Sequence, residues 1–368
     1  MASPEAARSE SSQTVVSIQE LAKKSITSLP QFSYMVRDND ERGAINETLS
    51  PEIPTIDFEK LIHGDSTQLE QEKLHSACRD WGFFQLVNHG MSPLVMKKVK
   101  DEIEEFFRLP SEELMKYKHR PGEVEGYGAV IRSNKKLDWG DKLYMITNPV
   151  HRRRPHLFPE FPSSLRTILE SYIIEMQNLA ITLVGYLGKA MMIEKREMEE
   201  MFEDGQQAIR MTYYPPCPQP ELVMGISAHS DACGFTILNQ LNGVDALQIK
   251  KDGIWIPVHV MPDALLVNIG DVLEMMSNGI YKSVDHRAVV SSDKERLSLG
   301  MFFNPKYEAE IGPAVNLISP ENPALYKRIG LEKYLSDYFS RNMIDGKSYL
   351  ENMKITNENP VNATLKHQ

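Results

Sequence analysis

Short β-type segments separated by turn residues fill residues 208–305, and no other feature limits the fold of this chain as strongly. Seven runs are apolar or alternate between apolar and polar residues: 211–214, 235–240, 247–250, 255–258, 264–269, 283–289 and 297–303. Glycine, proline, asparagine and aspartate stand between them, and Asp252-Gly253 is a favourable hairpin turn. Short strands at regular spacing predict an antiparallel sandwich or barrel.

Helical periodicity on both sides of this region predicts a fold that is mainly β with flanking helices (α+β). Upstream, 53–58 alternates like an edge strand, 81–87 is strand-like, and 69–79 and 95–107 have helical spacing. The longest helix is expected from about Ser164 to Met192, with one apolar, core-facing stripe. The chain then divides into an N-terminal extension, partly disordered (1–50), an N-terminal region (51–160), a long helix and linker (161–204), the β core (205–305) and a C-terminal helical region (306–368).

Charge and cysteine content restrict the class of protein and its partners. The 368 residues carry a formal net charge of -10, and such a field repels nucleic acid and anionic membrane surfaces. Three cysteines without metal-type spacing do not make a disulfide framework, which fits a reducing compartment. There is no signal-peptide pattern, and the apolar stretch 179–193 is shorter than the ~20 residues that span a bilayer. We expect a cytoplasmic protein that binds neither nucleic acid nor membranes.

Three residues form a candidate metal site. His229 and Asp231 are two positions apart, so in an extended segment their side chains share one face. His286 lies in another expected strand. Pairing of the two strands can bring its side chain beside those of His229 and Asp231. Two imidazoles and a carboxylate on one face of an octahedron leave three positions open, as iron chemistry with oxygen requires. The alternatives are a surface histidine beside a turn aspartate, and for His286 a solvated charge cluster.

Arg296 and Ser298 form a second candidate site, because they also share one face of an expected strand. A planar guanidinium beside a hydroxyl is well suited to the far carboxylate of a small diacid. Upstream, Tyr214 supplies a phenol that can reach the same carboxylate. The alternatives are an ion pair of Arg296 with Glu295 or Asp293, a polar core position for Ser298, and an aromatic core position for Tyr214.

Together these elements resemble a known family. The run 213–218 (Tyr-Tyr-Pro-Pro-Cys-Pro), then His229-x-Asp231, then His286, then Arg296-x-Ser298, has the order and spacing of the plant iron(II)/2-oxoglutarate-dependent dioxygenases. The segments 81–85, 88–90, 126–128 and 137–139 match the N-terminal region of that family. The chain is most similar to the senescence-related and alkaloid O-demethylase branch.

The resemblance implies a double-stranded β-helix core, a jelly roll of cupin-like type, with iron near one open end. It implies that His229, Asp231 and His286 bind Fe(II) as the catalytic triad, and that Arg296, Ser298 and Tyr214 bind 2-oxoglutarate. O2 is then the second co-substrate, and ascorbate is the expected reductant. His89 is not a ligand in this family, despite its Asn-His-Gly setting, and is expected to be structural.

One position departs from the family pattern: Thr212 stands where relatives often carry asparagine, near the co-substrate and metal. The substrate pocket is expected to be largely apolar with a few polar anchors. Its candidate residues are Phe302, Asn304, Tyr144, Arg210 and Phe235, and packing in the core or surface is the alternative for each.

The expected function is O-demethylation or hydroxylation of an alkaloid or similar aromatic plant metabolite by a monomeric enzyme. Other outcomes are hydroxylation or desaturation of a flavonoid, terpenoid or hormone. Two further alternatives are a non-catalytic small-molecule binding protein on the same scaffold and a zinc or nickel cupin, although the latter leaves Arg296-x-Ser298 unexplained.

Overall fold

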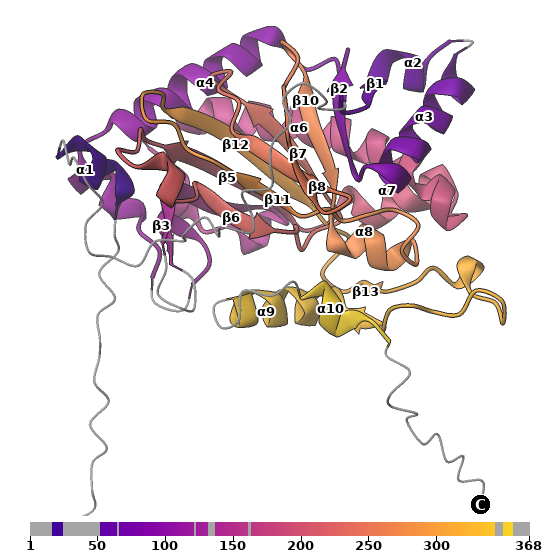
Figure 1. Ribbon diagram of the computed structural model, residues 1–368. Helices are drawn as coiled ribbons and strands as arrows, with labels where there is room; N and C mark the ends of the chain where they lie inside the picture. The colour runs from indigo at the N-terminus through magenta and orange to yellow at the C-terminus, as the bar shows by residue number, and fades with distance from the viewer. Residues whose placement is uncertain are drawn as a thin grey trace, which may run out of the picture.

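Two β-sheets form the centre of the protein in the computed structural model, which describes residues 17–24, 52–64, 66–120, 123–131, 137–160, 163–342 and 349–355 (Figure 1). Within these residues the large sheet has the order β1-β2-β10-β7-β12-β5-β4-β3, and the small sheet has the order β6-β11-β8-β9. The strands of the two sheets are β1 Thr55–Asp57, β2 Phe83–Val87, β3 Gly126–Ile131, β4 Leu137–Asn148, β5 Gln207–Tyr214, β6 Ile226–His229, β7 Phe235–Gln240, β8 Leu247–Lys251, β9 Ile254–Pro257, β10 Leu265–Ile269, β11 His286–Ala288 and β12 Arg296–Phe303.

The pairing of the core strands confirms the predicted jelly roll. In the large sheet β12 pairs antiparallel with both β7 and β5, and in the small sheet β11 pairs antiparallel with both β6 and β8. Each expected segment between 208 and 305 contains or overlaps a strand, and β1 lies at an edge as expected. In the large sheet, β3 and β4 were not predicted. They extend the large sheet next to β5, so residues of the N-terminal region lie beside the β core.

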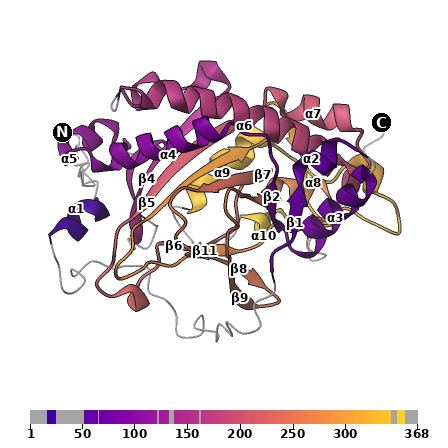
Figure 2. The same ribbon diagram turned by 90° about the horizontal axis from the view of Figure 1, so that it is seen from above.

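The helices lie outside the sheets. Their bounds are α1 Ile18–Lys23, α2 Phe58–Ile62, α3 Thr67–Asp80, α4 Pro93–Arg108, α5 Ser111–Leu114, α6 Leu165–Leu187, α7 Lys195–Glu203, α8 Asp271–Met276, α9 Leu331–Asn342 and α10 Leu350–Met353. Figure 2 shows α4 and α6 side by side along one side of the large sheet. A short pair of strands, β13 Glu310–Ile311 and β14 Ile329–Gly330, precedes α9.

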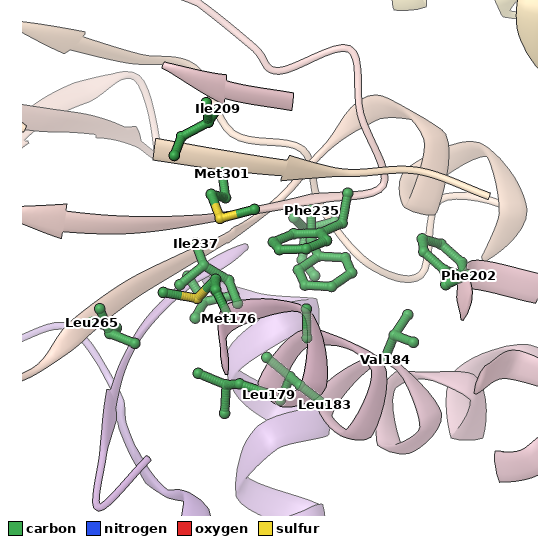
Figure 3. Close-up of a cluster of buried hydrophobic side chains, with 14 of the residues drawn as sticks. Met176, Leu179, Leu183, Val184, Phe202, Ile209, Phe235, Ile237, Leu265 and Met301 are labelled. Carbon is green, nitrogen blue, oxygen red and sulfur yellow. The ribbon is translucent and has the colours of Figure 1, made fainter. Parts of the chain in front are cut away.

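The hydrophobic core lies between α6 and the outer face of the large sheet. Met176 and Leu183 of α6 are fully buried and face Ile237 of β7 and Met301 of β12 (Figure 3). The predicted apolar stripe of this helix is therefore confirmed. Since each buried side chain of this size contributes about 1.5–3 kcal/mol, this layer fixes the large sheet as a rigid support for the side chains on its other face.

Helix α1 of the N-terminal extension is held by a buried carboxylate. Asp141 of β4 accepts hydrogen bonds from the backbone N–H groups of Ile18 and Gln19, both at 3.0 Å, and from the hydroxyls of Ser17 and Tyr127. Ser17 is also the N-cap of α1. The expectation of disorder in the first dozen residues lies outside the described residues.

Helices α9 and α10 lie together below the two sheets in the view of Figure 1. Tyr334 of α9 is fully buried, and its ring lies 5.2 Å from that of Tyr349, beside α10. In the part of the chain that the structure describes, every helix is too short or too polar to cross a membrane.

Candidate metal centre

Strand pairing brings His229 and His286 together. In the antiparallel pair β6–β11 these two residues are direct partners, and their ring centroids are 4.3 Å apart. Asp231 does not continue the strand as predicted, because β6 ends at His229 and Asp231 lies in the turn that follows. The carboxylate nevertheless reaches the two rings: its Oδ1 lies 3.7 Å from the Nε2 atom of each histidine.

The three side chains, which we call the triad, fit a single metal ion. One ligand atom from each lies within 4.8 Å of the others. Both 3.7 Å separations are shorter than twice a typical metal–ligand distance of about 2.1 Å, so one ion can bridge these atoms with little movement. Among the described residues this is the one group of metal-ligand type, and the small β6–β11 pair positions both imidazoles from adjacent strands.

Hydrogen bonds orient both imidazoles toward the same point. The Nδ1 atom of His229 lies 2.8 Å from the Ser227 carbonyl oxygen, and that of His286 lies 3.2 Å from the Val284 carbonyl oxygen. A carbonyl oxygen only accepts, so each Nδ1 carries the proton. The Nε2 lone pairs are thereby directed at the metal position, as in protein metal sites whose ligands are held by such contacts.

The carboxylate of Asp231 is held in a similar way. Its Oδ2 accepts hydrogen bonds from Thr236 Oγ1 at 2.6 Å and from Asn268 Nδ2 at 2.8 Å, which leaves Oδ1 facing the imidazoles. Burial of this side chain opposes its ionisation. The two histidines and these two hydrogen bonds outweigh that effect, so the pKa of Asp231 lies below its ordinary value. The ionised form is the one that binds metal.

Arg296 and Ser298 lie in the same cavity as the triad, which we call the inner cavity. Arg296 is 3% exposed, and its Nη1 lies 3.4 Å from Ser298 Oγ. Its Nε and Nη2 have no hydrogen-bond partner among the described residues. Tyr214 is the strand partner of Arg296, and its ring centroid lies 5.3 Å from the guanidinium carbon.

These contacts bear on the ion-pair interpretation of Arg296. An ion pair with Glu295 is not formed, since that carboxylate instead accepts a hydrogen bond from the Tyr213 hydroxyl at 2.8 Å. Burial lowers the pKa of the Arg296 guanidinium, and Tyr214 opposes this shift. A buried cation with two unpaired N–H groups is costly unless an anion completes it, so the inner cavity fits a carboxylate ligand at this position.

A second cavity, which we call the outer cavity, also borders His229 and Asp231. Four of the predicted substrate residues line it: Tyr144, Arg210, Phe302 and Asn304. The ring of Tyr144 lies 6.1 Å from that of Phe302 and 6.4 Å from that of Phe339 on α9. The wall therefore combines four aromatic side chains with six polar or charged ones, those of Lys142, Gln206, Arg210, His229, Asp231 and Asn304.

The fifth predicted substrate residue, Phe235, requires a correction. Its side chain is fully buried on the other face of the large sheet, where it stacks on Phe303 at 5.1 Å and lies 6.0 Å from Phe202 (Figure 3). It lines neither cavity. The reason is alternation: Phe235 begins β7 on the face that packs against α6, whereas Thr236 points to the triad.

Sequence reasoning missed several residues of the site. Thr236 and Asn268 hold Asp231, and Lys142, Leu335 and Tyr338 line the outer cavity. The last two come from α9, whose pattern indicated a helix but not the place where it lies. His89, by contrast, stays outside the site as expected: its ring lies 3.0 Å from the Asp263 carbonyl oxygen.

Comparisons with known proteins agree with this geometry. Residues 205–305 match the model of the 2OG-Fe(II) oxygenase superfamily, and residues 53–161 match that of the non-haem dioxygenase in morphine synthesis N-terminal region. The chain is 47% identical to oxoglutarate-dependent flavonoid 7-O-demethylase 1 of Ocimum basilicum, covering 93% of this chain and 92% of that protein. It is 46% identical to codeine O-demethylase of Papaver somniferum, covering 93% of this chain and 96% of the relative.

A solved structure shares the fold as well. The crystal structure of JOX2 in complex with 2OG, Fe and JA has a TM-score of 0.81 and 34% sequence identity, covering 93% of this chain and 98% of that one. Two matching family models and relatives of this identity over nearly the full chain establish the family. The chain belongs to the 2OG-Fe(II) oxygenase superfamily and is a 2-oxoglutarate-dependent dioxygenase that uses iron, 2-oxoglutarate and O2.

Proposed function

We propose that His229, Asp231 and His286 bind the catalytic Fe(II). The observation that supports this is the 3.7 Å separation of Asp231 Oδ1 from the Nε2 atoms of both histidines. The Nδ1 atom of each histidine also donates a hydrogen bond to a backbone carbonyl oxygen, which orients the ring. Three ligands on one side of an ion leave the other side free for co-substrate and O2. Bound iron with these two reactants supplies the oxidising power that converts a substrate C–H bond to C–OH.

Arg296, Ser298 and Tyr214 are proposed to bind the far carboxylate of 2-oxoglutarate. Two N–H groups of Arg296 have no partner among the described residues, and a carboxylate matches them in charge and geometry. Ser298 adds a hydroxyl at 3.4 Å from the guanidinium, and the Tyr214 ring forms an adjacent wall. The inner cavity extends from this anchor to the triad, so the chain holds both ends of the diacid and excludes water around it.

The outer cavity is proposed to bind a small aromatic plant metabolite. Its aromatic side chains from β4, β12 and α9 suit a flat ring, and a ring bound there would lie beside the proposed metal position, because His229 and Asp231 border the cavity. The two relatives named above act as O-demethylases, so a methoxyl group is the favoured target. Hydroxylation of a methoxyl carbon gives a hemiacetal, which breaks down to a free hydroxyl and formaldehyde.

Simple hydroxylation of a ring or alkyl carbon is the second candidate, because the same geometry presents any C–H bond to the metal. A non-catalytic binding protein is not favoured, since a sensor need not retain both the triad and the Arg296 anchor. A monomer in the cytoplasm remains our prediction. The three cysteines are buried and free, as is typical of a reducing compartment.

A pooled metabolite screen tests this function. The protein is incubated with Fe(II), 2-oxoglutarate, ascorbate and methoxylated flavonoids, alkaloids and phenylpropanoids, and succinate, formaldehyde and substrate mass are followed together. O-demethylation gives equal amounts of succinate and formaldehyde and a product that has lost a methylene unit. A product that has gained one oxygen, without formaldehyde, supports hydroxylation instead. Substrate binding without any succinate would exclude an oxygenase role.

A further inference from the structure

The buried carboxylate of Asp271 lies close to the triad without being part of it. This residue begins α8, is fully buried and lines neither cavity. Burial of a carboxylate is costly unless hydrogen bonds satisfy it. Three hydroxyls donate to this one, those of Ser230, Ser283 and Tyr334. Each comes from a different segment, so one carboxylate joins three parts of the chain that are far apart in the sequence.

The first contact reaches the turn that carries Asp231. Ser230 immediately precedes Asp231, and its hydroxyl donates to the Asp271 carboxylate. The backbone N–H of Asp271 also donates to the Asp231 carbonyl oxygen at 2.8 Å. Two further backbone hydrogen bonds join residues 270–272 to residues 233–234. The start of α8 and this turn are therefore bound to one another, so a shift of Asp271 would shift the turn as well.

The second contact reaches the segment that precedes His286. Ser283 Oγ donates to Asp271 Oδ1 at 2.7 Å. The next residue is Val284, whose carbonyl oxygen accepts a hydrogen bond from His286 Nδ1. Asp271 therefore contacts both of the segments that supply the three ligand side chains.

The third contact comes from α9, which covers the outer cavity. Tyr334 is fully buried, and its hydroxyl donates to Asp271 Oδ2 at 3.3 Å. Residues three and four apart lie on one face of a helix, and the neighbours of Tyr334 on this face, Leu335, Tyr338 and Phe339, line the outer cavity. A ligand in this cavity would pack against α9, and α9 contacts Asp271.

We propose that Asp271 is a positioning residue that couples the outer cavity to the metal centre. Its carboxylate transmits the packed position of α9, through the Tyr334 hydroxyl, to the two segments that carry the triad. This inference rests on the proposed function, because it takes the triad as the iron site. Coupling between two sites is reciprocal: if the packed helix favours metal binding, bound metal favours the packed helix by the same factor. A substrate that stabilises the packed helix then raises the affinity for iron.

Titration with Fe(II) in the absence of O2 tests one direction of the coupling. Tyr334→Phe removes only the hydroxyl that reaches Asp271, at a residue that lines neither cavity. The Fe(II) dissociation constant is expected to rise by about fivefold, at the lower end of typical coupling between sites. Tyr349→Phe is the matched control, because its hydroxyl donates to Asp337 of α9, away from Asp271. It should leave the dissociation constant within about twofold of wild type.

Hydrogen exchange of α9 tests the reverse direction and requires neither turnover nor a known substrate. In wild type, saturating Fe(II) without O2 should slow the exchange of residues 331–340 by about fivefold. In Tyr334→Phe this slowing should disappear, although Fe(II) still binds at higher concentration. A residue that served folding alone would change the exchange of α9 equally with and without metal.

A double-mutant cycle assigns the coupling to Asp271. Asp271→Ala should raise the Fe(II) dissociation constant by roughly tenfold or more, and addition of Tyr334→Phe should then have no further effect, because its partner is already absent. Asn268→Leu, which acts on Asp231 through a separate hydrogen bond, should instead add to Tyr334→Phe in full. The first two measurements do not depend on the folding of Asp271→Ala.

Three results would overturn the proposal: Fe(II) binding to wild type that leaves the exchange of α9 unchanged, a Tyr334→Phe protein with the Fe(II) affinity of wild type, or an equal loss of affinity in Tyr349→Phe. Full additivity of Asp271→Ala and Tyr334→Phe would also contradict it, since the tyrosine would then act through another residue. Failure of wild type to bind one Fe(II) per chain would contradict the proposed function itself, and so is distinct from all of these.

Discussion

The side chains of the proposed iron site are oriented by neighbours that are not themselves candidate ligands. Each imidazole uses Nδ1 to bind a backbone carbonyl, and Asp231 uses Oδ2 to accept from Thr236 and Asn268. These contacts select the histidine tautomer and the carboxylate orientation before a metal arrives. Preorganised ligands lose little conformational entropy on binding, so affinity should depend on the outer contacts as well as on the ligands.

Removal of the Asn268 amide tests this dependence. Asn268→Leu keeps a branched side chain with the same number of heavy atoms but removes one of the two hydrogen bonds that hold Asp231. The Fe(II) dissociation constant is expected to rise by roughly 10–100-fold, as for other contacts of this kind. Anaerobic metal titration measures it. Asn352→Leu, at an exposed asparagine of α10 outside both cavities, is the matched control. An unchanged Fe(II) affinity in Asn268→Leu would contradict the role given to this amide.

Loss of the Arg296 guanidinium should weaken the binding of 2-oxoglutarate and leave the binding of Fe(II) unchanged. In Arg296→Ala we expect the KM for 2-oxoglutarate to rise by roughly 30-fold or more, because truncation of a buried charge partner costs about 2–5 kcal/mol. Fe(II) affinity should stay near that of wild type, since no ligand atom is removed. Steady-state succinate release at varied 2-oxoglutarate gives the KM. A KM close to that of wild type would remove Arg296 from the co-substrate site.

At this scale the sequence led to a proposal for the residues that bind the metal and the co-substrate. The triad and the Arg296-x-Ser298 pair were recognised because their order and spacing matched a family pattern. Thr236, Asn268 and Lys142 were not recognised, since nothing in their local sequence distinguishes them from ordinary strand residues. Phe235 was misplaced because alternation within β7 allows either face, and only the packing against α6 decides which one is buried.

At the scale of elements, the docking of α1 is the feature least visible in the sequence. The sequence indicated no partner for this segment, whereas Ile18 packs into a cluster with Trp139 and Leu137, and Asp141 satisfies the N–H groups at the start of the helix. A carboxylate at a helix N-terminus is favourable for both hydrogen bonding and the helix dipole. Strand β5, which carries Tyr214, lies next to β4, which carries Asp141. The contact between Asp141 and α1 therefore supports one wall of the inner cavity.

Asp141→Asn is expected to release α1 while the core stays folded. The two carboxylate oxygens accept four hydrogen bonds, whereas an amide offers one acceptor and turns its own donors toward N–H and O–H groups. Hydrogen exchange of residues 18–24 should accelerate by about tenfold or more, the effect of losing about 1 to 2 kcal/mol of local stability. Exchange in β7 and β12 should not change.

Asp293→Asn, at an exposed aspartate, is the control for this substitution, and Ser17→Ala is a milder variant that removes the cap. Equal protection of residues 18–24 in wild type and Asp141→Asn would show that the apolar contacts of Ile18 suffice to hold the helix. Faster exchange throughout β7 and β12 would show that Asp141 supports the whole sheet and not α1 in particular.

Over the whole molecule, periodicity predicted the kind of each element better than its place. Strands between 208 and 305 and the helix α6 were expected from alternation and from three- and four-residue steps. The order of strands in the two sheets depends on long-range pairing, which local patterns do not encode. For the same reason β4 was not placed beside β5, and α9 was not expected to close the outer cavity with Leu335, Tyr338 and Phe339.

Titration of the protein with Fe(II) in the absence of O2, in wild type and in Asp231→Ala, tests the central claim most directly. One ion per chain is expected for wild type. In Asp231→Ala saturation should disappear over the same concentration range, with circular dichroism confirming that the fold is retained. A folded Asp231→Ala protein that still binds one ion with the affinity of wild type would contradict the assignment of His229, Asp231 and His286 as the iron site.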